Sequence, residues 1–396
     1  MKKVIFMCIN MNVGGTEKAL LTMLDEMDKE KYEITILMLE EYGGFLDSIP
    51  SYVKIKYVED FSNMKPRLNN PPIQVAKNLI KSEKLVKGIN ILAIHLVTKV
   101  FGERSLYFKY LLKNYKKIEG EYDLAAAYAG PMDFITYFVL RKIKAKKKVQ
   151  WIHFDIAKIG FNLKFANKFY GKFDKVFVVS KEGKSKLIER VPSLEKNTEV
   201  FFNIVSENKI KDLASRDMGF EDDFNGIRIL TVGRLAKEKG QDMTILVLSK
   251  LKNEGYKVKW YCIGEGNARS DYESMIKEYK VEEDYILLGS KTNPYPFMKE
   301  CDIYVQSSRH EGYCITLAEA KILKNSIITT NFTGAKEQIE NNETGLISDI
   351  NEMDLYIKIK RLLDNNDLSE TIKNNLRSET TSRLKEIDKL DRLLNI

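Results

Sequence analysis

Residues 227–263 read IRILTVGRLAKEKGQDMTILVLSKLKNEGYKVKWYCI, and this stretch decides the fold class. An apolar run at 227–232 ends in a glycine, a helical pattern follows at 243–251, and a second apolar run covers 258–263. Continuous apolar runs of this length, as opposed to alternating ones, are typical of parallel strands covered on both faces. The stretch therefore predicts a strand, a helix and a parallel strand, the repeating unit of α/β proteins.

The same alternation extends over most of the 396 residues, and a chain of this length is too long for one ordinary core. We predict an α/β fold of two facing Rossmann-like domains, with the active site in the cleft between them. A polar stretch without strand character marks the boundary. The predicted divisions are a first domain at 1–203, a linker at 204–224, a second domain at 225–375 and a charged C-terminal helix at 376–396 that packs back on the first domain.

The composition is that of a globular protein, with 44% hydrophobic and 30% charged residues. The first apolar run is too short for a secretory signal, and no later run is long enough to span a membrane, so we expect a cytoplasmic protein. Three histidines and the absence of a C-x-x-C motif leave few ligands for a transition metal, so no metal cofactor is expected. Cys8, Cys262 and Cys301 lie in or beside apolar runs and are interpreted as small buried hydrophobes.

Positive charge is concentrated in one region. Residues 65–117 carry twelve Lys and Arg residues against two Glu residues, a surplus of ten, and 141–148 add six more cations. Interleaved with apolar residues, this pattern is typical of basic amphipathic helices on an anionic bilayer, and it predicts peripheral association with the inner face of the membrane. The alternative is a solvated helical face with an ordinary core side. No recognition motif accompanies the charge, so nucleic acid is not expected.

The strongest local pattern is SRHEGYCITLAEA at 308–320, which follows an apolar run and opens a helix. It places Glu311 and Glu319 eight residues apart, a rise of about 12 Å if helical. That is close to the distance between the hexose hydroxyls and the ribose of a nucleotide sugar, and the helix start between the two carboxylates can face a diphosphate. The alternative is that Thr316 and Glu319 form only a capping box.

A second pattern lies at 231–240, where Arg234 and Lys239 follow a strand that ends in Gly233. Two cations there can neutralise the charge of a departing diphosphate, although a surface loop with scattered lysines gives the same pattern. Gly264-Glu265-Gly266 follows the next strand but lacks the third glycine and the acidic partner of a nicotinamide site.

The first domain offers weaker signals. Gly14 and Gly15 follow the first strand, where they either bring backbone amides close to a phosphate or form a simple turn. His153 ends a strand and can hydrogen-bond a sugar or an acceptor, or it can be a histidine satisfied within the core. Asp155 and Asp133 are candidates on the acceptor side.

Taken in order, these elements resemble the retaining GT-B glycosyltransferases of the family-4 type, the group 1 glycosyltransferases. The resemblance covers nearly the whole chain, and the elements that carry it are Gly14–Glu17, His153, Val179-Ser180, Gly233-Arg234, Lys239-Gly240, Gly264–Gly266, Leu288-Gly289, Glu311 with Glu319, and Gly334 with Glu337.

The resemblance implies metal-independent transfer of a sugar from a nucleotide sugar, commonly a UDP-sugar, to a glycan or a lipid-pyrophosphate-linked acceptor in bacterial surface polysaccharide or glycolipid synthesis. It assigns catalytic roles to Arg234, Lys239, Glu311 and His153, with Glu319 on the ribose. The implied donor-binding residues also include Gly15, Gly233, Gly264, Gly289, Lys291, Asn293, Gly312, Tyr313, Cys314, Ile315 and Thr316. Cys314 departs from the family, which commonly has glycine there.

Other readings stay open at this point. The same scaffold suits a nucleotide-sugar epimerase or a phosphorylase, and a non-catalytic sugar-binding protein is a third hypothesis. For the transferase we prefer a same-face substitution in which the leaving phosphate helps to deprotonate the acceptor, with Asp155 and Asp133 as candidate nucleophiles for a covalent route.

Overall fold

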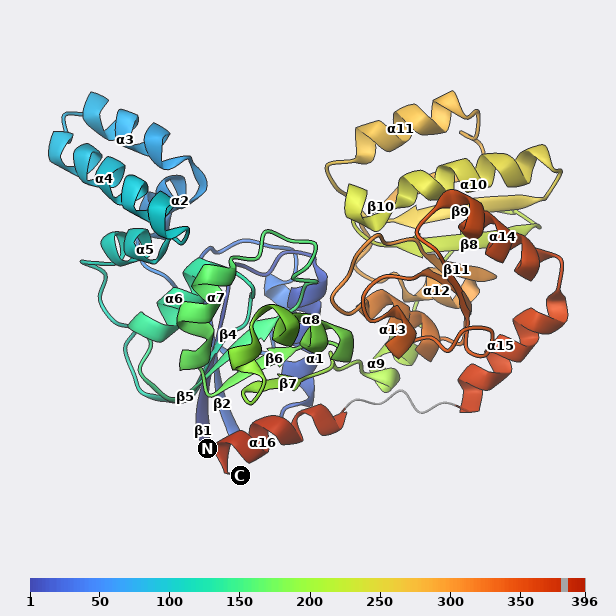
Figure 1. Ribbon diagram of the computed structural model, residues 1–396. Helices are drawn as coiled ribbons and strands as arrows, with labels where there is room; N and C mark the ends of the chain where they lie inside the picture. The colour runs from blue at the N-terminus through green and yellow to red at the C-terminus, as the bar shows by residue number, and fades with distance from the viewer. Residues whose placement is uncertain (379–383, 396) are drawn as a thin grey trace. The chain divides into compact units, whose positions relative to one another are not determined.

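The computed structural model describes residues 1–378 and 384–395, which fall into two compact units. Unit 1 contains residues 1–179, 183–201 and 386–395, and unit 2 contains 180–182, 202–378 and 384–385. Each unit is an α/β domain around one parallel sheet. In Figure 1, unit 1 is coloured from blue to green, apart from its red C-terminal segment 386–395, and unit 2 from green to red.

Unit 1 has a seven-stranded sheet in the order β3-β2-β1-β4-β5-β6-β7, and every pairing is parallel. The neighbouring strands β1 and β4 bury the side chains of Val4–Cys8 and of 124–127, as the apolar pattern predicts, with Val4 opposite Leu124. The strands are β1 (Lys2–Cys8), β2 (Tyr32–Met38), β3 (Lys54–Tyr57), β4 (Tyr122–Ala127), β5 (Ala145–Ile152), β6 (Lys175–Val178) and β7 (Thr198–Val200).

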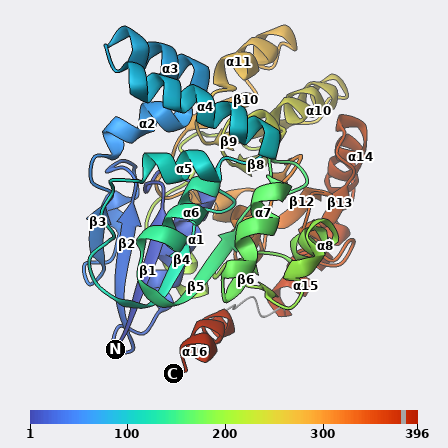
Figure 2. The same cartoon turned by 60° about the vertical axis from the view of Figure 1, so that its left-hand side comes forward.

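The helices of unit 1 are α1 (Gly15–Glu26), α2 (Phe61–Asn69), α3 (Pro72–Lys81), α4 (Leu85–Phe101), α5 (Ser105–Leu111), α6 (Asp133–Lys142), α7 (Leu163–Phe169) and α16 (Asp388–Leu394), with α8 (Lys181–Arg190) from Gly183 onward. The basic region therefore becomes four helices, α2 to α5, between β3 and β4. Figure 2 shows them running in sequence along one side of unit 1.

Unit 2 has a six-stranded parallel sheet in the order β10-β9-β8-β11-β12-β13. The strands are β8 (Ile227–Val232), β9 (Val258–Ile263), β10 (Tyr285–Gly289), β11 (Ile303–Gln306), β12 (Ser326–Thr330) and β13 (Leu346–Ser348). The helices are α9 (Glu207–Leu213), α10 (Gln241–Asn253), α11 (Arg269–Glu278), α12 (Tyr295–Glu300), α13 (Ile315–Ile322), α14 (Glu352–Leu363) and α15 (Asn366–Ser378).

The strand order of unit 2 is that of a Rossmann fold, and the first six strands of unit 1 follow the same order. In both units the chain direction across the sheet reverses between two central strands, β1 and β4 or β8 and β11. Ligands of open α/β sheets bind at the carboxyl ends of the strands at such a point. The predicted class, two Rossmann-like α/β domains, is confirmed.

Two segments differ from their predicted form. The polar stretch 204–224 contains a helix, α9, and groups with unit 2, because Ile210 and Ala214 give it a buried side that the surrounding charges obscure in the sequence. In the stretch 376–396, the described residues contain the end of α15, a 3-10 turn at Leu384–Glu386 and α16 from Asp388, so the described part is not one continuous α-helix; 379–383 and 396 lie outside the described residues. α16 contacts unit 1, where Lys389 Nζ donates to the carbonyl of Val200 at 2.7 Å.

Among the helices that the structure describes, none is both long and apolar enough to cross a membrane.

Candidate functional site

Three loops meet at the carboxyl edge of the unit 2 sheet. The amide of Gly233, after β8, donates to Ile263 at 2.9 Å, and the amide of Gly264, after β9, donates to Gly289 at 2.9 Å. Gly264 has φ +148°, and a Cβ there would lie 2.1 Å from the carbonyl oxygen of Gly233. Glycine is therefore required at 264 for the loops to come this close, which gives this predicted donor-side glycine a structural reason.

A lysine and a glutamate form the centre of this edge. Lys239 Nζ lies 2.5 Å from Glu311 Oε1, and the Ser308 hydroxyl donates to the same oxygen at 2.7 Å. The two side chains are only 20% and 13% exposed. Ser307 fixes the lysine backbone by donating to the Lys239 carbonyl at 2.8 Å. Two predicted site residues, 72 positions apart in the chain, are thus brought into direct contact.

Lys239 carries a positive charge in this setting. Burial acts to lower its pKa, but the adjacent Glu311 carboxylate outweighs that effect and holds the pKa above its usual value. The result is a fixed cation with a carboxylate beside it, at the place where a strand, a tight loop and a helix start converge.

Arg234 lies on the same loop but is held differently. Its side chain is 64% exposed and contacts Glu238 at 3.3 Å. The fully buried Gln241 donates to the Arg234 carbonyl at 3.0 Å and fixes the backbone. The backbone of Arg234 is therefore fixed, while its guanidinium is exposed and only weakly paired.

Glu319 does not form the capping box that the sequence left open. Helix α13 begins at Ile315 after Cys314, so Thr316 lies inside the helix, where its hydroxyl donates to Gln306 at 3.0 Å. Glu319 is 1% exposed and accepts a hydrogen bond from the Tyr295 hydroxyl at 3.0 Å. That alternative was wrong because the N-cap is Cys314, two residues before the Thr316 that the Thr-x-x-Glu spacing requires.

Cys314 occupies the N-cap position of α13. Its thiol is 3% exposed and lies 3.2 Å from the Thr316 hydroxyl. Burial, with a contribution from the charge of Glu311, raises its pKa to about 12, so the thiol stays protonated. With its amide oxygen turned toward the Cys314 N–H, the Gln338 side chain pairs with both backbone groups of Cys314, at 3.2 and 2.9 Å. The backbone N–H of Cys314, a predicted donor-binding residue, therefore has a partner within the protein.

The loop after β10 contains the other predicted donor residues. Gly289 has φ +72°, and Lys291 Nζ lies 5.8 Å from the centre of the Phe297 ring. The Asn293 side chain donates to the carbonyl of Leu213 at 2.9 Å. Asn293 therefore ties this loop to α9, a structural role that the sequence did not indicate.

In unit 1, Gly15 begins α1 with Gly14 before it. Apart from its chain neighbours and the backbone of α1 itself, no atom of the described residues lies within 4 Å of where a Gly15 Cβ would be. The positive end of α1 therefore has open space beside it, which an anion can use.

His153 follows β5 and is 6% exposed. Its ring is nearly parallel to that of Trp151, with centroids 6.3 Å apart, and lies 4.5 Å from the Tyr128 ring. Within the described chain, neither ring nitrogen makes a well-formed hydrogen bond. Burial lowers its pKa to about 3, against a smaller opposing effect of the Tyr128 backbone, so the imidazole is neutral at physiological pH. A histidine satisfied within the core does not fit this environment.

The two acceptor-side aspartates differ. Asp155 is 3% exposed, and both its oxygens are engaged, by the Ala157 amide at 2.8 Å and by Lys186 Nζ at 3.1 Å. Asp133 is the first residue of α6, and burial raises its pKa to about 7, with Arg104 acting against the shift and Glu103 adding to it. Asp133 is therefore poised to exchange a proton near neutral pH.

Sequence reasoning missed three residues that support the unit 2 edge: Ser308, Gln241 and Tyr295. Ser308 lies three positions before Glu311, a spacing that can bring a hydroxyl to a carboxylate within one turn. Gln241 and Tyr295 carry no signal of this kind, because their contacts depend on how α10 and α12 pack.

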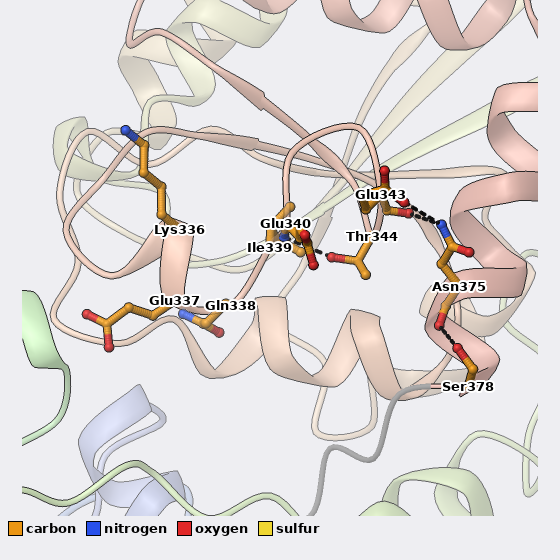
Figure 3. Close-up of a pocket in the computed structure, with 9 residues that line it drawn as sticks. All are labelled: Lys336, Glu337, Gln338, Ile339, Glu340, Glu343, Thr344, Asn375 and Ser378. Atoms are coloured by element: carbon orange, nitrogen blue, oxygen red, sulfur yellow. Dashed lines mark hydrogen bonds between the residues drawn. The ribbon is translucent and has the colours of Figure 1, made fainter.

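Figure 3 shows a different part of unit 2, a polar pocket of about 450 Å³. Within it, the Asn375 amide donates to the Glu343 carbonyl at 2.9 Å, and the Thr344 hydroxyl accepts from the Glu340 amide at 2.9 Å. The pocket contains none of the predicted site residues. Its lining residues are Lys336, Glu337, Gln338, Ile339, Glu340, Glu343, Thr344, Asn375 and Ser378.

Comparison with known proteins agrees with this architecture. Residues 221–379 match the family described as glycosyl transferases group 1. The solved structures of Anabaena Alr3699/HepE in complex with UDP and glucose and of sucrose-phosphate synthase from Thermosynechococcus elongatus superimpose on this chain with TM-scores of 0.70 and 0.68, at 17% and 13% identity. They cover 100% of this chain, and 100% and 97% of the other chains. The fold is thus the two-domain fold of GT-B proteins.

Curated relatives give the same class. The chain is 30% identical over 223 residues to the N-acetylgalactosamine-N,N'-diacetylbacillosaminyl-diphospho-undecaprenol 4-alpha-N-acetylgalactosaminyltransferase of Campylobacter jejuni, 56% of this chain and 58% of that protein. It is 30% identical over 158 residues to the capsular polysaccharide biosynthesis glycosyltransferase CapM of Staphylococcus aureus, 38% of this chain and 40% of CapM. The matches therefore span about half the length of these relatives. Residues 221–379 therefore match the group 1 glycosyltransferases and the fold is that of GT-B proteins, in agreement with the resemblance predicted from the sequence.

Proposed function

We propose that this protein is a retaining glycosyltransferase that moves a sugar from a nucleotide sugar, a UDP-sugar, to a glycan or lipid-linked glycan acceptor. The products would be bacterial surface polysaccharides or glycolipids. The observation that carries the proposal is the contact of Lys239 with Glu311 at the carboxyl edge of the unit 2 sheet, within the segment that matches the family. The names of the relatives, which act on a diphospho-undecaprenol-linked sugar and in capsule synthesis, support the same class of acceptor.

The donor chemistry follows from the fixed charges. Lys239 and the exposed Arg234 head supply two positive charges to the diphosphate, the work that a divalent metal does in other transferases, so we propose a metal-independent reaction. An arriving phosphate competes with Glu311 for Lys239, and the displaced carboxylate becomes available to accept hydrogen bonds from the sugar. Glu319 is assigned to the ribose.

In the reaction, the bond between the anomeric carbon and the diphosphate breaks, and the acceptor hydroxyl forms a new bond on the same face. The acceptor proton passes to the leaving phosphate oxygen. His153, neutral and without a good partner in the described chain, can orient a hydroxyl but cannot supply a positive charge. Because both oxygens of Asp155 are engaged, we favour this route over a covalent intermediate at Asp155.

We further propose that the acceptor is linked to a lipid pyrophosphate and that the protein is peripheral on the inner face of the cell membrane. The basic helices of 65–117 are the proposed contact. The second basic segment, 141–148, contributes less than its composition suggests. Three of its lysines are paired with carboxylates: Lys144 with Glu121, Lys146 with Asp123 and Lys147 with Asp174.

Sugar transfer tests the proposal. The wild type and Glu311→Gln are incubated with a panel of nucleotide sugars and membrane-extracted acceptor lipids, with and without a chelator, and the product anomer is read by NMR. We expect chelator-resistant transfer with retention, lowered at least about a hundredfold in the variant. Isomerisation or phosphorolysis of the donor without an acceptor would instead indicate an epimerase or a phosphorylase. Donor binding without turnover would indicate a sugar-binding protein.

A further inference from the structure

Helices α3 and α4 form a hairpin in unit 1, side by side in Figures 1 and 2. The close approach is made at Gly88 of α4, where a Cβ would lie 2.6 Å from Ile80 and 3.0 Å from the carbonyl oxygen of Ala76, both on α3. Besides Gly88, α4 buries Ile91 and Thr98. These three residues define the inner side of the helix.

The opposite side of α4 is apolar and uncovered. At about 100° per residue, six of its seven large exposed apolar side chains fall within an arc of about 120° on the side away from Gly88, and the seventh, Phe101, lies about 40° beyond that arc. Single exposed hydrophobic residues are ordinary, but a continuous stripe along one helix marks a surface that meets another apolar phase. This apolar stripe consists of Leu85, Val86, Ile89, Leu96, Val97 and Val100, which are 56%, 73%, 58%, 65%, 39% and 79% exposed.

The positive charge of the hairpin indicates which kind of surface the apolar stripe binds. Between Pro72 and Phe101 there are five lysines and one acidic residue, Glu83. None of these lysines forms an ion pair with any residue of 1–378 or 384–395. A second copy of the chain docked through the same stripe would bring like charges together, whereas an anionic lipid surface would pair with them. The lysines are Lys77, Lys81, Lys84, Lys87 and Lys99.

We propose that α4 lies flat in the interface of an anionic bilayer, with the apolar stripe inserted among the acyl chains and the lysines at the headgroups. At 17 residues, about 25 Å, the helix has the length of an interfacial helix. The inference rests on the proposed lipid-linked acceptor and makes it specific: attachment is by insertion of one helix face, and the paired lysines Lys144, Lys146 and Lys147 take no part.

Insertion can be measured from the fluorescence of a tryptophan introduced on the stripe. The two native tryptophans, Trp151 and Trp260, are 1% and 0% exposed, so an indole introduced by Val100→Trp is the exposed reporter. With phosphatidylglycerol-containing vesicles we expect its emission to shift to the blue and to be quenched by brominated acyl chains. Ile357→Trp, at an equally helical and 49% exposed site of unit 2, is the control and should not respond.

Vesicle co-sedimentation then distinguishes insertion of the apolar stripe from electrostatic attraction of the lysines. Leu96→Asp with Val100→Asp should lower vesicle partitioning at least about tenfold, and wild-type binding should persist in part at high salt, because insertion is not screened. Lys144→Gln with Lys146→Gln should bind like the wild type. Circular dichroism checks that each variant is folded.

Two results would overturn the proposal: an unquenched Val100→Trp indole in vesicle-bound protein, or binding abolished entirely by salt. Stripe-dependent dimerisation in sedimentation equilibrium, with no vesicle binding, would assign the stripe to a second copy. Lys239→Ala keeps these outcomes apart from the transferase proposal, because it should lose transfer and keep vesicle binding. A wild-type protein that binds vesicles but shows no sugar transfer would count against the transferase proposal and leave the membrane proposal standing.

Discussion

Replacement of Asp133 by asparagine should stabilise unit 1, and the gain should depend on pH. Asp133 is the first residue of α6, and burial is the largest cause of its raised pKa, which is about 7 against an ordinary value of 3.8. Asparagine has nearly the same shape and carries no charge. The substitution therefore removes the cost of ionising a partly buried carboxyl while leaving the packing in place.

The sign and size follow from proton linkage. Below pH 3.8 the carboxyl is protonated in both states, so the variant gains nothing. Between pH 3.8 and 7 the unfolded chain releases the proton while the folded chain keeps it, so stability of the wild type falls as pH rises. Above pH 7 the cost is constant. A shift of about three units corresponds to about 4 kcal/mol, the largest gain expected for Asp133→Asn at pH 8.

The assay is urea unfolding of the wild type and Asp133→Asn at pH 5 and pH 8, followed by far-ultraviolet circular dichroism. Asp47→Asn, at an exposed carboxylate of unit 1, is the matched control. We expect the free energy of unfolding of Asp133→Asn to exceed that of the wild type by clearly more at pH 8 than at pH 5. The control should show no such change. An advantage that is equal at both pH values, or a variant less stable at pH 8, would refute the reasoning. A stabilised variant with impaired transfer would show that the carboxyl is retained for function.

Three further predictions concern unit 2. Ser308→Ala removes the hydroxyl that holds Glu311 at 2.7 Å and should lower kcat/KM about tenfold in steady-state transfer assays, with the fold intact. Gly264→Ala places a methyl group 2.1 Å from a carbonyl oxygen at φ +148° and should destabilise unit 2 by about 2–3 kcal/mol in urea; unchanged stability would mean that the loops can separate freely. Glu319→Gln should weaken binding of a nucleoside diphosphate about tenfold by calorimetry, and unaltered affinity would remove Glu319 from the ribose.

The architecture could be predicted from the sequence because burial on both faces leaves a continuous apolar run for each parallel strand. Residues 227–263 form the predicted strand, helix and strand as β8, α10 and β9. Local spacing also singled out Glu311, Lys239 and the glycine at 264. What the sequence could not give was the contact between Lys239 and Glu311, since it depends on how β8 and β11 pair in the sheet.

Composition predicted the roles of charged and polar stretches less well than the apolar pattern predicted the fold. The lysines of 141–148 add to the positive charge of 65–117 in the sequence, yet three of them meet carboxylates on neighbouring elements: Glu121, Asp123 and Asp174. The polar stretch 204–224 was predicted as a linker, although Ile210 and Ala214 anchor a helix there. In both cases the deciding contacts join residues that are distant in sequence, and a count of charges cannot reveal them.

The central claim is that Lys239, held beside Glu311 at the edge of the unit 2 sheet, binds the pyrophosphate of a nucleotide sugar. Calorimetric titration of uridine diphosphate into the wild type, Lys239→Ala and Lys237→Ala tests it most directly. Lys237 is an exposed cation two residues away on the same short 3-10 turn, Lys237–Lys239. The wild type and Lys237→Ala should bind alike, and Lys239→Ala should bind about a hundredfold more weakly. Equal affinity of all three proteins, or no binding by the wild type, would contradict the claim.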